Sequence, residues 1–319
     1  MPVLRATIRR KKAASSAFTL VELLVSMFIL SILVLVMGQM LTMTEGAWSL
    51  GEANKERMQN ARAISGFIGN ELRAALLPIN RTSTTDLQFV VNPPALTAAT
   101  FNNRDSIFWQ VPLATDQTLG DVAEVGYFVQ WDTTKASNPH SQLCRFFVNH
   151  GTGTVANTNF LIYSNPTAWL TDSIVKSVAS GKQQDAYQGL FAENILGLWV
   201  KCLDPLGNQI TKDAAGTAFA NNSFDSRRGY SYTDSSQTPT NVVMPICSLP
   251  SVIEISLVTL DSRSSARVET AGQTAITQLT GTSSDAAAFV SSALTNANFQ
   301  KFRQGMRSYQ TRIYLQASK

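Results

Sequence analysis

The sequence Phe18-Thr-Leu-Val-Glu-Leu-Leu-Val-Ser-Met-Phe-Ile-Leu30 opens an apolar run that continues to Met43. Glu22 is the only ionisable side chain in this run, which is longer than the roughly 20 residues that cross a hydrocarbon layer. Five basic and no acidic residues precede it, whereas acidic and basic residues are mixed after Glu45. The run therefore predicts one membrane span, with the N-terminus in the cytoplasm and the remainder exported.

Ordinary export does not explain Glu22, because a carboxylate in a spanning helix costs about 2.5–3.5 kcal/mol on insertion scales. A plain signal anchor whose carboxylate reaches back to the headgroups is one explanation. A cleaved secretory signal fits less well, since its apolar core is only about 7–15 residues long. The remaining explanation is a partner that compensates the charge of Glu22.

A short basic leader, a small residue and Phe-Thr-Leu-Val-Glu ahead of the apolar run resemble the N-terminus of type IV pilins and type II secretion pseudopilins. In that family a prepilin peptidase cleaves before the Phe and methylates the new amine. The resemblance implies cleavage between Ala17 and Phe18, although the family normally has Gly where this chain has Ala17. It also implies that Glu22, the fifth mature residue, pairs with the N-terminal amine of a neighbouring subunit.

The net charge of +4 gives no support to a nucleic-acid partner. Five of the 26 basic residues lie in the leader, residues 1–17, which leaves 21 basic against 22 acidic side chains. The basic balance is therefore a targeting feature. The three cysteines, Cys144, Cys202 and Cys247, are too far apart for a local metal site, and we prefer buried free thiols to a disulfide.

The helical pattern continues beyond the span as an amphipathic segment, residues 44–78. Its apolar positions recur every three or four residues: Met58, Ala61, Ile64, Phe67, Ile68, Leu72, Ala75 and Leu76. Charged residues, Arg57 among them, lie between these positions and are expected on the polar face. Pro78 ends the pattern, so residues 18 to about 77 predict one helix of ~60 residues, about 90 Å long.

Residues 79–319 predict an antiparallel β head, so that the fold class is α+β with a pilin-like arrangement of helix and sheet. The expected strands are 87–91, 106–111, 123–131, 142–148, 194–203, 252–261 and 308–316. Asp204 to Asn208 predict a hairpin turn. Residues 213–245 predict a long, partly mobile loop and 271–284 a second loop, while 285–305 predict one or two short helices.

Short motifs in the head resemble two groups within this family. Those of the J-type minor pseudopilins are matched by Tyr127-Phe128-Val129, Leu143-Cys144-Arg145, the segment 191–198, and Leu249-Pro250 with the strand that follows. Those of the C component of the Verru_Chthon cassette are matched by Ala61-Arg62-Ala63, Gly126-Tyr127-Phe128-Val129, Ala192-Glu193-Asn194, Phe224-Asp225-Ser226-Arg227 and Tyr309-Gln310-Thr311-Arg312-Ile313.

The sequence predicts no enzyme, cofactor or metal site, because few titratable groups converge. His140 and His150 lack metal-ligand spacing and are expected in solvated loops. Ser173 and Lys176 match Ser-x-x-Lys, but the other elements of that enzyme class are missing. The aromatic residues Trp109, Trp131, Trp169 and Trp199 are expected in the core.

These observations predict a structural minor pilin or pseudopilin subunit, a single-pass protein of the bacterial inner membrane whose head lies in the periplasm. Its expected partners are other pilin-like subunits, the prepilin peptidase and the inner-membrane assembly platform. The alternative is a ligand- or substrate-binding head at a filament tip, with residues 213–245 as the contact surface. An exposed aromatic or basic patch would favour this alternative, and a charge-mixed polar surface would favour the structural subunit.

Overall fold

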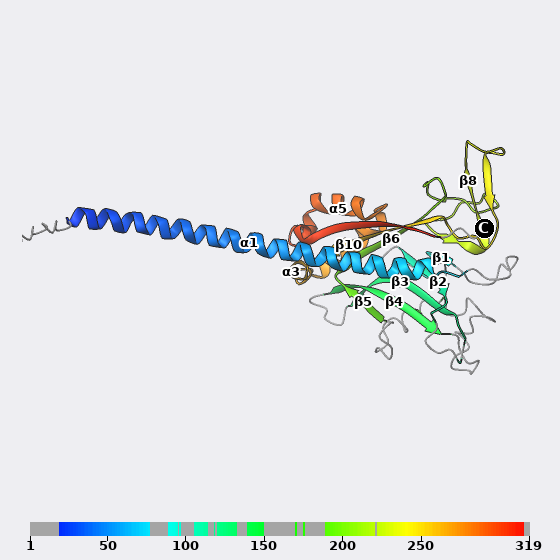
Figure 1. Ribbon diagram of the computed structural model, residues 1–319, viewed down its shortest axis with the longest axis horizontal. Helices are drawn as coiled ribbons and strands as arrows, with labels where there is room; N and C mark the ends of the chain where they lie inside the picture. The colour runs from blue at the N-terminus through cyan, green and yellow to red at the C-terminus, as the bar shows by residue number, and fades with distance from the viewer. Residues whose placement is uncertain are drawn as a thin grey trace, which may run out of the picture. The chain divides into compact units, whose positions relative to one another are not determined.

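The computed structural model describes residues 19–76, 89–94, 96, 105–113, 118, 120–132, 139–149, 170, 175, 189–220 and 222–315 (Figure 1). The chain divides into two compact units, Met1–Asn54 and Lys55–Lys319. One helix, α1 (Leu20–Arg73), contributes to both units. The long helix and the antiparallel strands of the head confirm the α+β fold class.

The upstream part of α1 is exposed throughout its unit. Every described side chain from Leu20 to Ser49 is exposed, although most are apolar. Gly38 does not interrupt the helix. Among the described residues, α1 is the one helix whose length and composition suffice to cross a membrane, so the predicted span coincides with a continuous helix.

The downstream part of α1, from Lys55 to Arg73, packs on the head, and we call it the docked segment. Ala61, Ile64, Ile68 and Leu72 are buried and lie on one face at helical spacing, which confirms the predicted stripe. Two details of the pattern were wrong. Met58 is 51% exposed, whereas Arg57 is buried, and the helix ends at Arg73 instead of continuing to about residue 77.

The described part of the head contains two main antiparallel sheets and a hairpin. The six-stranded sheet has the order β5-β4-β3-β2-β1-β7, the three-stranded sheet the order β11-β10-β6, and β8 pairs with β9. The strands of the first sheet are β1 (Phe89–Val91), β2 (Ser106–Val111), β3 (Ala123–Asp132), β4 (His140–Asn149), β5 (Gly189–Glu193) and β7 (Phe224–Asp225). The others are β6 (Ile195–Leu203), β8 (Tyr230–Thr233), β9 (Asn241–Met244), β10 (Val252–Leu260) and β11 (Met306–Tyr314). The expected strands each correspond to one of these.

Asn194 is where the chain passes from one sheet to the other. It separates β5 from β6 and has a φ of 62°, a left-handed conformation that Asn tolerates better than most residues. Its N–H donates to the carbonyl of Ser141 in β4 (2.8 Å), and its carbonyl accepts from the N–H of Leu260 in β10 (2.9 Å). The backbone of Asn194 thus joins the two sheets.

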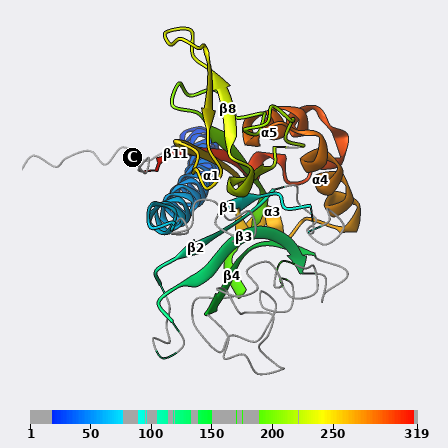
Figure 2. The same ribbon diagram turned by 90° about the vertical axis from the view of Figure 1, so that its right-hand side faces the viewer.

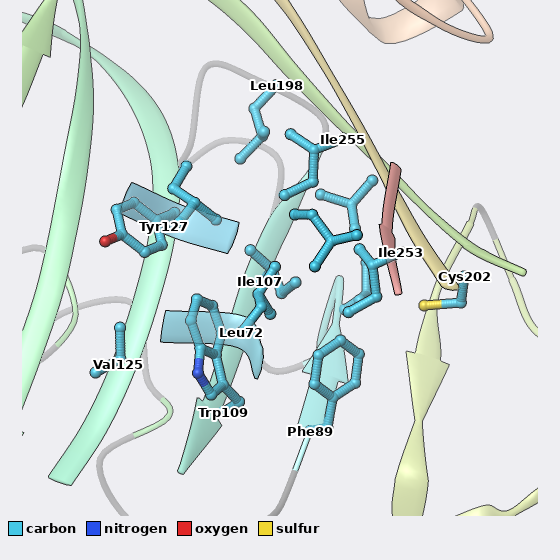
Figure 3. Close-up of a cluster of buried hydrophobic side chains, with 14 of the residues drawn as sticks. Leu72, Phe89, Ile107, Trp109, Val125, Tyr127, Leu198, Cys202, Ile253 and Ile255 are labelled. Carbon is cyan, nitrogen blue, oxygen red and sulfur yellow. The ribbon is translucent and has the colours of Figure 1, made fainter. Parts of the chain in front are cut away.

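The main core lies between the docked segment and the facing sides of both sheets (Figure 3). It combines Leu72 of α1, Ile107 and Trp109 of β2, and Ile253 and Ile255 of β10. Trp199 lies on the other face of the three-stranded sheet, against α4 (Thr270–Thr282) and α5 (Ala286–Thr295). In Figure 2 these two helices lie together, apart from strands β2 to β4. A third cluster, which includes Phe108 and Phe146, lies on the outer face of the six-stranded sheet.

Two predicted loops contain regular structure. Residues 213–245 include β7, β8, β9 and the short helix η2 (Ser226–Arg228), while their mobility stays a prediction. Residues 271–284 were wrongly predicted as a loop, because Gly and Thr have low helix propensity. Burial of Ala275 and Ile276 in the cluster around Trp199 stabilises α4 instead. The remaining short helices are α3 (Ser262–Ser265), η3 (Ala297–Phe299) and η4 (Arg303–Gly305).

Candidate functional site

The first turn of α1 carries a capping box formed by Thr19 and Glu22. The N–H and the hydroxyl of Thr19 each donate to Oε2 of Glu22 (3.0 Å each), and the N–H of Glu22 donates to the hydroxyl of Thr19 (3.3 Å). This reciprocal pattern satisfies N–H groups that a helix start leaves unpaired. Glu22 therefore helps to start the helix, a role that the sequence interpretation missed although Thr-x-x-Glu is its signature.

The capping box leaves part of the carboxylate of Glu22 unused. Both bonds from Thr19 reach Oε2, and among the described residues none donates to Oε1. Glu22 is also exposed within its unit. The carboxylate is thus accessible to a group from another molecule. Ala17 and Phe18, the predicted cleavage site, lie outside the described residues.

The end of the docked segment is held by a buried ion pair. Arg145 of β4 donates to both carboxylate oxygens of Glu71, through Nη2 to Oε1 and through Nε to Oε2 (3.3 Å). The hydroxyl of Tyr127 in β3 also donates to Oε2. Burial and the charge of Glu71 raise the pKa of Tyr127 well above its ordinary value, so Tyr127 remains a neutral donor. Tyr127 and Arg145 come from two of the head motifs noted in the sequence.

Neighbouring aromatic groups enclose this ion pair. The indole N–H of Trp109 donates to the backbone carbonyl of Glu71 (3.2 Å). The guanidinium carbon of Arg145 lies 4.7 Å from the ring centroid of Phe147 and 5.6 Å from that of Phe67, within the range of a cation–π contact. The pair is therefore both hydrogen-bonded and shielded, which fixes the end of α1 against the sheet.

The start of the docked segment is held by Arg57. Its Nη1 atom lies 3.0 Å from Oδ2 of Asp261 and also donates to the carbonyl of Gly305. Asp261 itself caps α3 by accepting from the N–H of Ser264 (2.6 Å). A Cβ atom at Gly305 would lie 2.2 Å from Oδ2 of Asp261, so only glycine fits beside this ion pair.

Other motif residues stabilise the head locally. Asp225 accepts from Nε (2.9 Å) and Nη2 (2.6 Å) of Arg227, which orders the turn after β7. Arg312 of β11 donates to Glu254 of the neighbouring β10 (2.8 Å). These pairs explain the motifs around Asp225 and Arg312 as structural elements of the fold.

All three cysteines are buried, and Cys144 and Cys202 are free thiols, as preferred from the sequence. Burial raises the pKa of the Cys144 thiol to about 12, so the reactive thiolate is rare at neutral pH. Trp109, Trp131 and Trp199 are buried as expected. His140 begins β4 instead of lying in a loop. His150, Trp169, Ser173 and Lys176 lie outside the described residues.

Comparison with protein families finds the prokaryotic N-terminal methylation motif at residues 12–38. None of the curated proteins matches the sequence significantly. The motif match covers the last six residues of the leader, the predicted cleavage site, Thr19 and Glu22. It supports a type IV pilin-like or pseudopilin subunit that a prepilin peptidase processes and that assembles with other pilin subunits. The apolar helix is consistent with anchoring in the inner membrane.

The two anchors of the docked segment were not predicted. Arg57 was placed on the polar face, and Glu71 was not singled out. The one available signal was the position of Glu71, which directly precedes the buried Leu72 and follows Ile68 by three residues. The partner of Arg57 lies 204 residues away in sequence and the partner of Glu71 lies 74 residues away. Only the folded head therefore reveals the pairing.

Proposed function

We propose that this chain is a structural minor pilin or pseudopilin subunit of a type IV pilus-like or type II secretion filament. The observation that carries the proposal is a methylation motif that overlaps a half-helix whose described apolar side chains are all exposed within their unit. Such a surface is stable in lipid before assembly and among similar helices afterwards. The likeness to J-type pseudopilins and to the Verru_Chthon C component belongs to this proposal.

In the proposed cycle the N-terminus begins in the cytoplasm and the head in the periplasm. The peptidase cleaves between Ala17 and Phe18, and the assembly platform then transfers the subunit into the filament. Glu22 pairs with the methylated N-terminal amine of a neighbouring subunit. At an effective dielectric constant of about 20, two charges ~4 Å apart attract by about 4 kcal/mol, which is enough to favour one register of packing. The chain performs no catalysis in this cycle.

The alternative, a ligand-binding head with residues 213–245 as its contact surface, has no specific observation in its favour within that segment. The arginines of the segment 213–245 are both paired, Arg227 with Asp225 (2.6 Å) and Arg228 with Asp213. This is a charge-mixed surface, which favours the structural subunit. We therefore keep ligand contact by residues 213–245 as the second hypothesis.

The test separates the capping role of Glu22 from its charge. Glu22→Gln keeps a capping-box acceptor but removes the charge, whereas Thr19→Val removes the hydroxyl and keeps the charge. If Glu22 pairs with an amine, Glu22→Gln and Glu22→Val each lower crosslinked recovery with other pilin-like subunits at least tenfold, and Thr19→Val does not. N-terminal mass spectrometry of membrane fractions checks that insertion and cleavage are unchanged. Recovery of Glu22→Gln at the wild-type level would contradict the pairing.

A further inference from the structure

The start of the docked segment lies at one end of the head. We call this end of the head the base. Two distant segments meet there. The N–H of Asp261 donates to the carbonyl of Gly305 (3.2 Å), and Arg57 of α1 contacts both residues. Asp261 is the N-cap of α3, so this short helix begins at the same end of the docked segment. The base is therefore the part of the head where the chain enters from the predicted span.

Basic side chains dominate the base. Residues 261–269 and 297–307 contain five basic and two acidic residues. Both acids are already paired, Asp261 with Arg57 and Glu269 with Lys301 (2.6 Å).

Three arginines at the base, Arg263, Arg267 and Arg307, form what we call the basal basic cluster. All three are exposed. None of them forms a salt bridge with a carboxylate among the described residues. The guanidinium of Arg307 donates only to nearby backbone carbonyls, those of Gln304 and Met306, which leaves its charge uncompensated.

The chain keeps this cluster near a membrane surface. Trp48 is 74% exposed and is of a residue type enriched at membrane interfaces. Position 57 follows position 48 by nine residues, so the chain cannot separate them by more than ~30 Å, however the two units are arranged. Arginine side chains are long, and electrostatic attraction extends a further ~8 Å at physiological salt. Anionic headgroups are therefore within reach of the base for as long as the helix remains in the bilayer.

We propose that the basal basic cluster binds anionic lipid headgroups and holds the head against the bilayer before assembly. A lipid surface fits better than an acidic protein because the helix tethers the cluster beside it, which gives a high effective concentration. The inference goes beyond the proposed function and rests only on its membrane-inserted state. Extraction into a filament would then have to release this contact.

The test uses the full chain in vesicles of phosphatidylcholine, with or without phosphatidylglycerol. Gln304, an exposed residue beside Gly305, is replaced by Cys and labelled with a fluorophore, and a quencher is attached to lipid headgroups. The native cysteines are buried and do not compete for the label. The double variant Arg263→Gln with Arg267→Gln is compared with Arg73→Gln with Lys212→Gln, which removes two exposed basic residues elsewhere.

We expect stronger quenching with phosphatidylglycerol, and its loss near 1 M salt, where the screening length is about 3 Å. The basal double variant should lower the ratio of membrane-bound to unbound heads about thirtyfold, because it removes two charges that contribute ~1 kcal/mol each at an anionic surface. The control variant should behave as wild type.

Equal quenching in both lipids, or an unaffected basal variant, would overturn the proposal. Quenching that appears only when pilin-like subunits are added, together with crosslinks from position 304 to those subunits, would show that the cluster contacts another subunit. That result would also overturn the proposal. Vesicle flotation distinguishes these failures from that of the proposed function. If the chain floats with the vesicles but its quenching does not depend on the lipid, only the lipid contact is contradicted. If the chain floats with neither kind of vesicle, membrane insertion is contradicted, and the lipid contact that depends on insertion is contradicted as well.

Discussion

The two halves of α1 belong to one continuous helix, yet their apolar side chains have different surroundings. Leu33 in the upstream part is 52% exposed within its unit, whereas Leu72 in the docked segment is fully buried. The upstream part is apolar all round, and the docked segment has one apolar stripe. The comparison shows that both halves are helical, while the surroundings that stabilise their apolar side chains must come from different sources.

The charged residues differ in the same way. Arg57 and Glu71 of the docked segment are buried, and the head supplies each with an ionic partner. Among the described residues of its unit, Glu22 of the upstream part is bound by Thr19 alone. A charge moved out of water needs a partner, and in the proposed function another subunit supplies to Glu22 what the docked segment receives from its own chain.

The largest effect should follow from breaking the ion pair at the end of the docked segment. Glu71→Leu leaves Arg145 buried without its carboxylate, and we expect the free energy of unfolding of the head to fall by about 3–5 kcal/mol. Urea unfolding of the full chain in detergent micelles, followed by tryptophan fluorescence, measures it.

The control for this variant removes both charges. Glu71→Leu combined with Arg145→Met should regain most of the lost stability, because apolar replacements of a buried pair are often nearly neutral. A double variant as unstable as the single one would show that packing, and not charge, anchors the helix.

A matched leucine pair tests the difference between the halves directly. Leu72→Ala removes a fully buried side chain and should lower the free energy of unfolding by about 2–5 kcal/mol. Leu33→Ala makes the same chemical change in the exposed upstream part and should leave head stability within about 0.5 kcal/mol of wild type. The same unfolding assay applies, and equal losses would contradict the separation of the two units.

A smaller effect concerns Glu124 of β3, which is buried in the head. Burial raises its pKa to about 8, although Gln110 donates to Oε1 (2.9 Å). The folded state therefore holds a proton that the unfolded state releases near pH 4.5, so stability falls as pH rises between these values. At about 1.4 kcal/mol per pH unit, we expect a loss of roughly 2 kcal/mol between pH 6 and 7.5 from this group.

The variant Glu124→Gln should remove this pH dependence and stabilise the head at pH 7.5. Glu193→Gln, which changes an exposed carboxylate in β5, serves as the control and should keep the wild-type profile. Thermal melts at the two pH values provide the measurement. A profile for Glu124→Gln that still declines with pH would place the titrating group elsewhere.

Much of the fold could be predicted from local patterns, but the anchors could not. The span, the stripe of Ile64, Ile68 and Leu72, and most strands follow from short-range periodicity. The loop predicted at 271–284 failed because its Gly and Thr content concealed a helix that tertiary burial stabilises. Glu22 was recognised from a local motif, whereas Glu71 has its charged partner in β4, and no local pattern encodes that distance.

The sequence by itself determined that one long apolar helix with a single acidic residue near its start precedes an antiparallel head. These features depend on residues within a few positions of one another, which is the range over which helix period, span length and turn chemistry act. Only the tertiary structure decided that Arg57 and Glu71 are buried anchors and that Asn194 joins two sheets. It also brought Arg263 and Arg307 to the same end of the head. Each of these depends on contacts between residues distant in sequence, because burial and charge pairing are set by which surfaces meet when the chain folds.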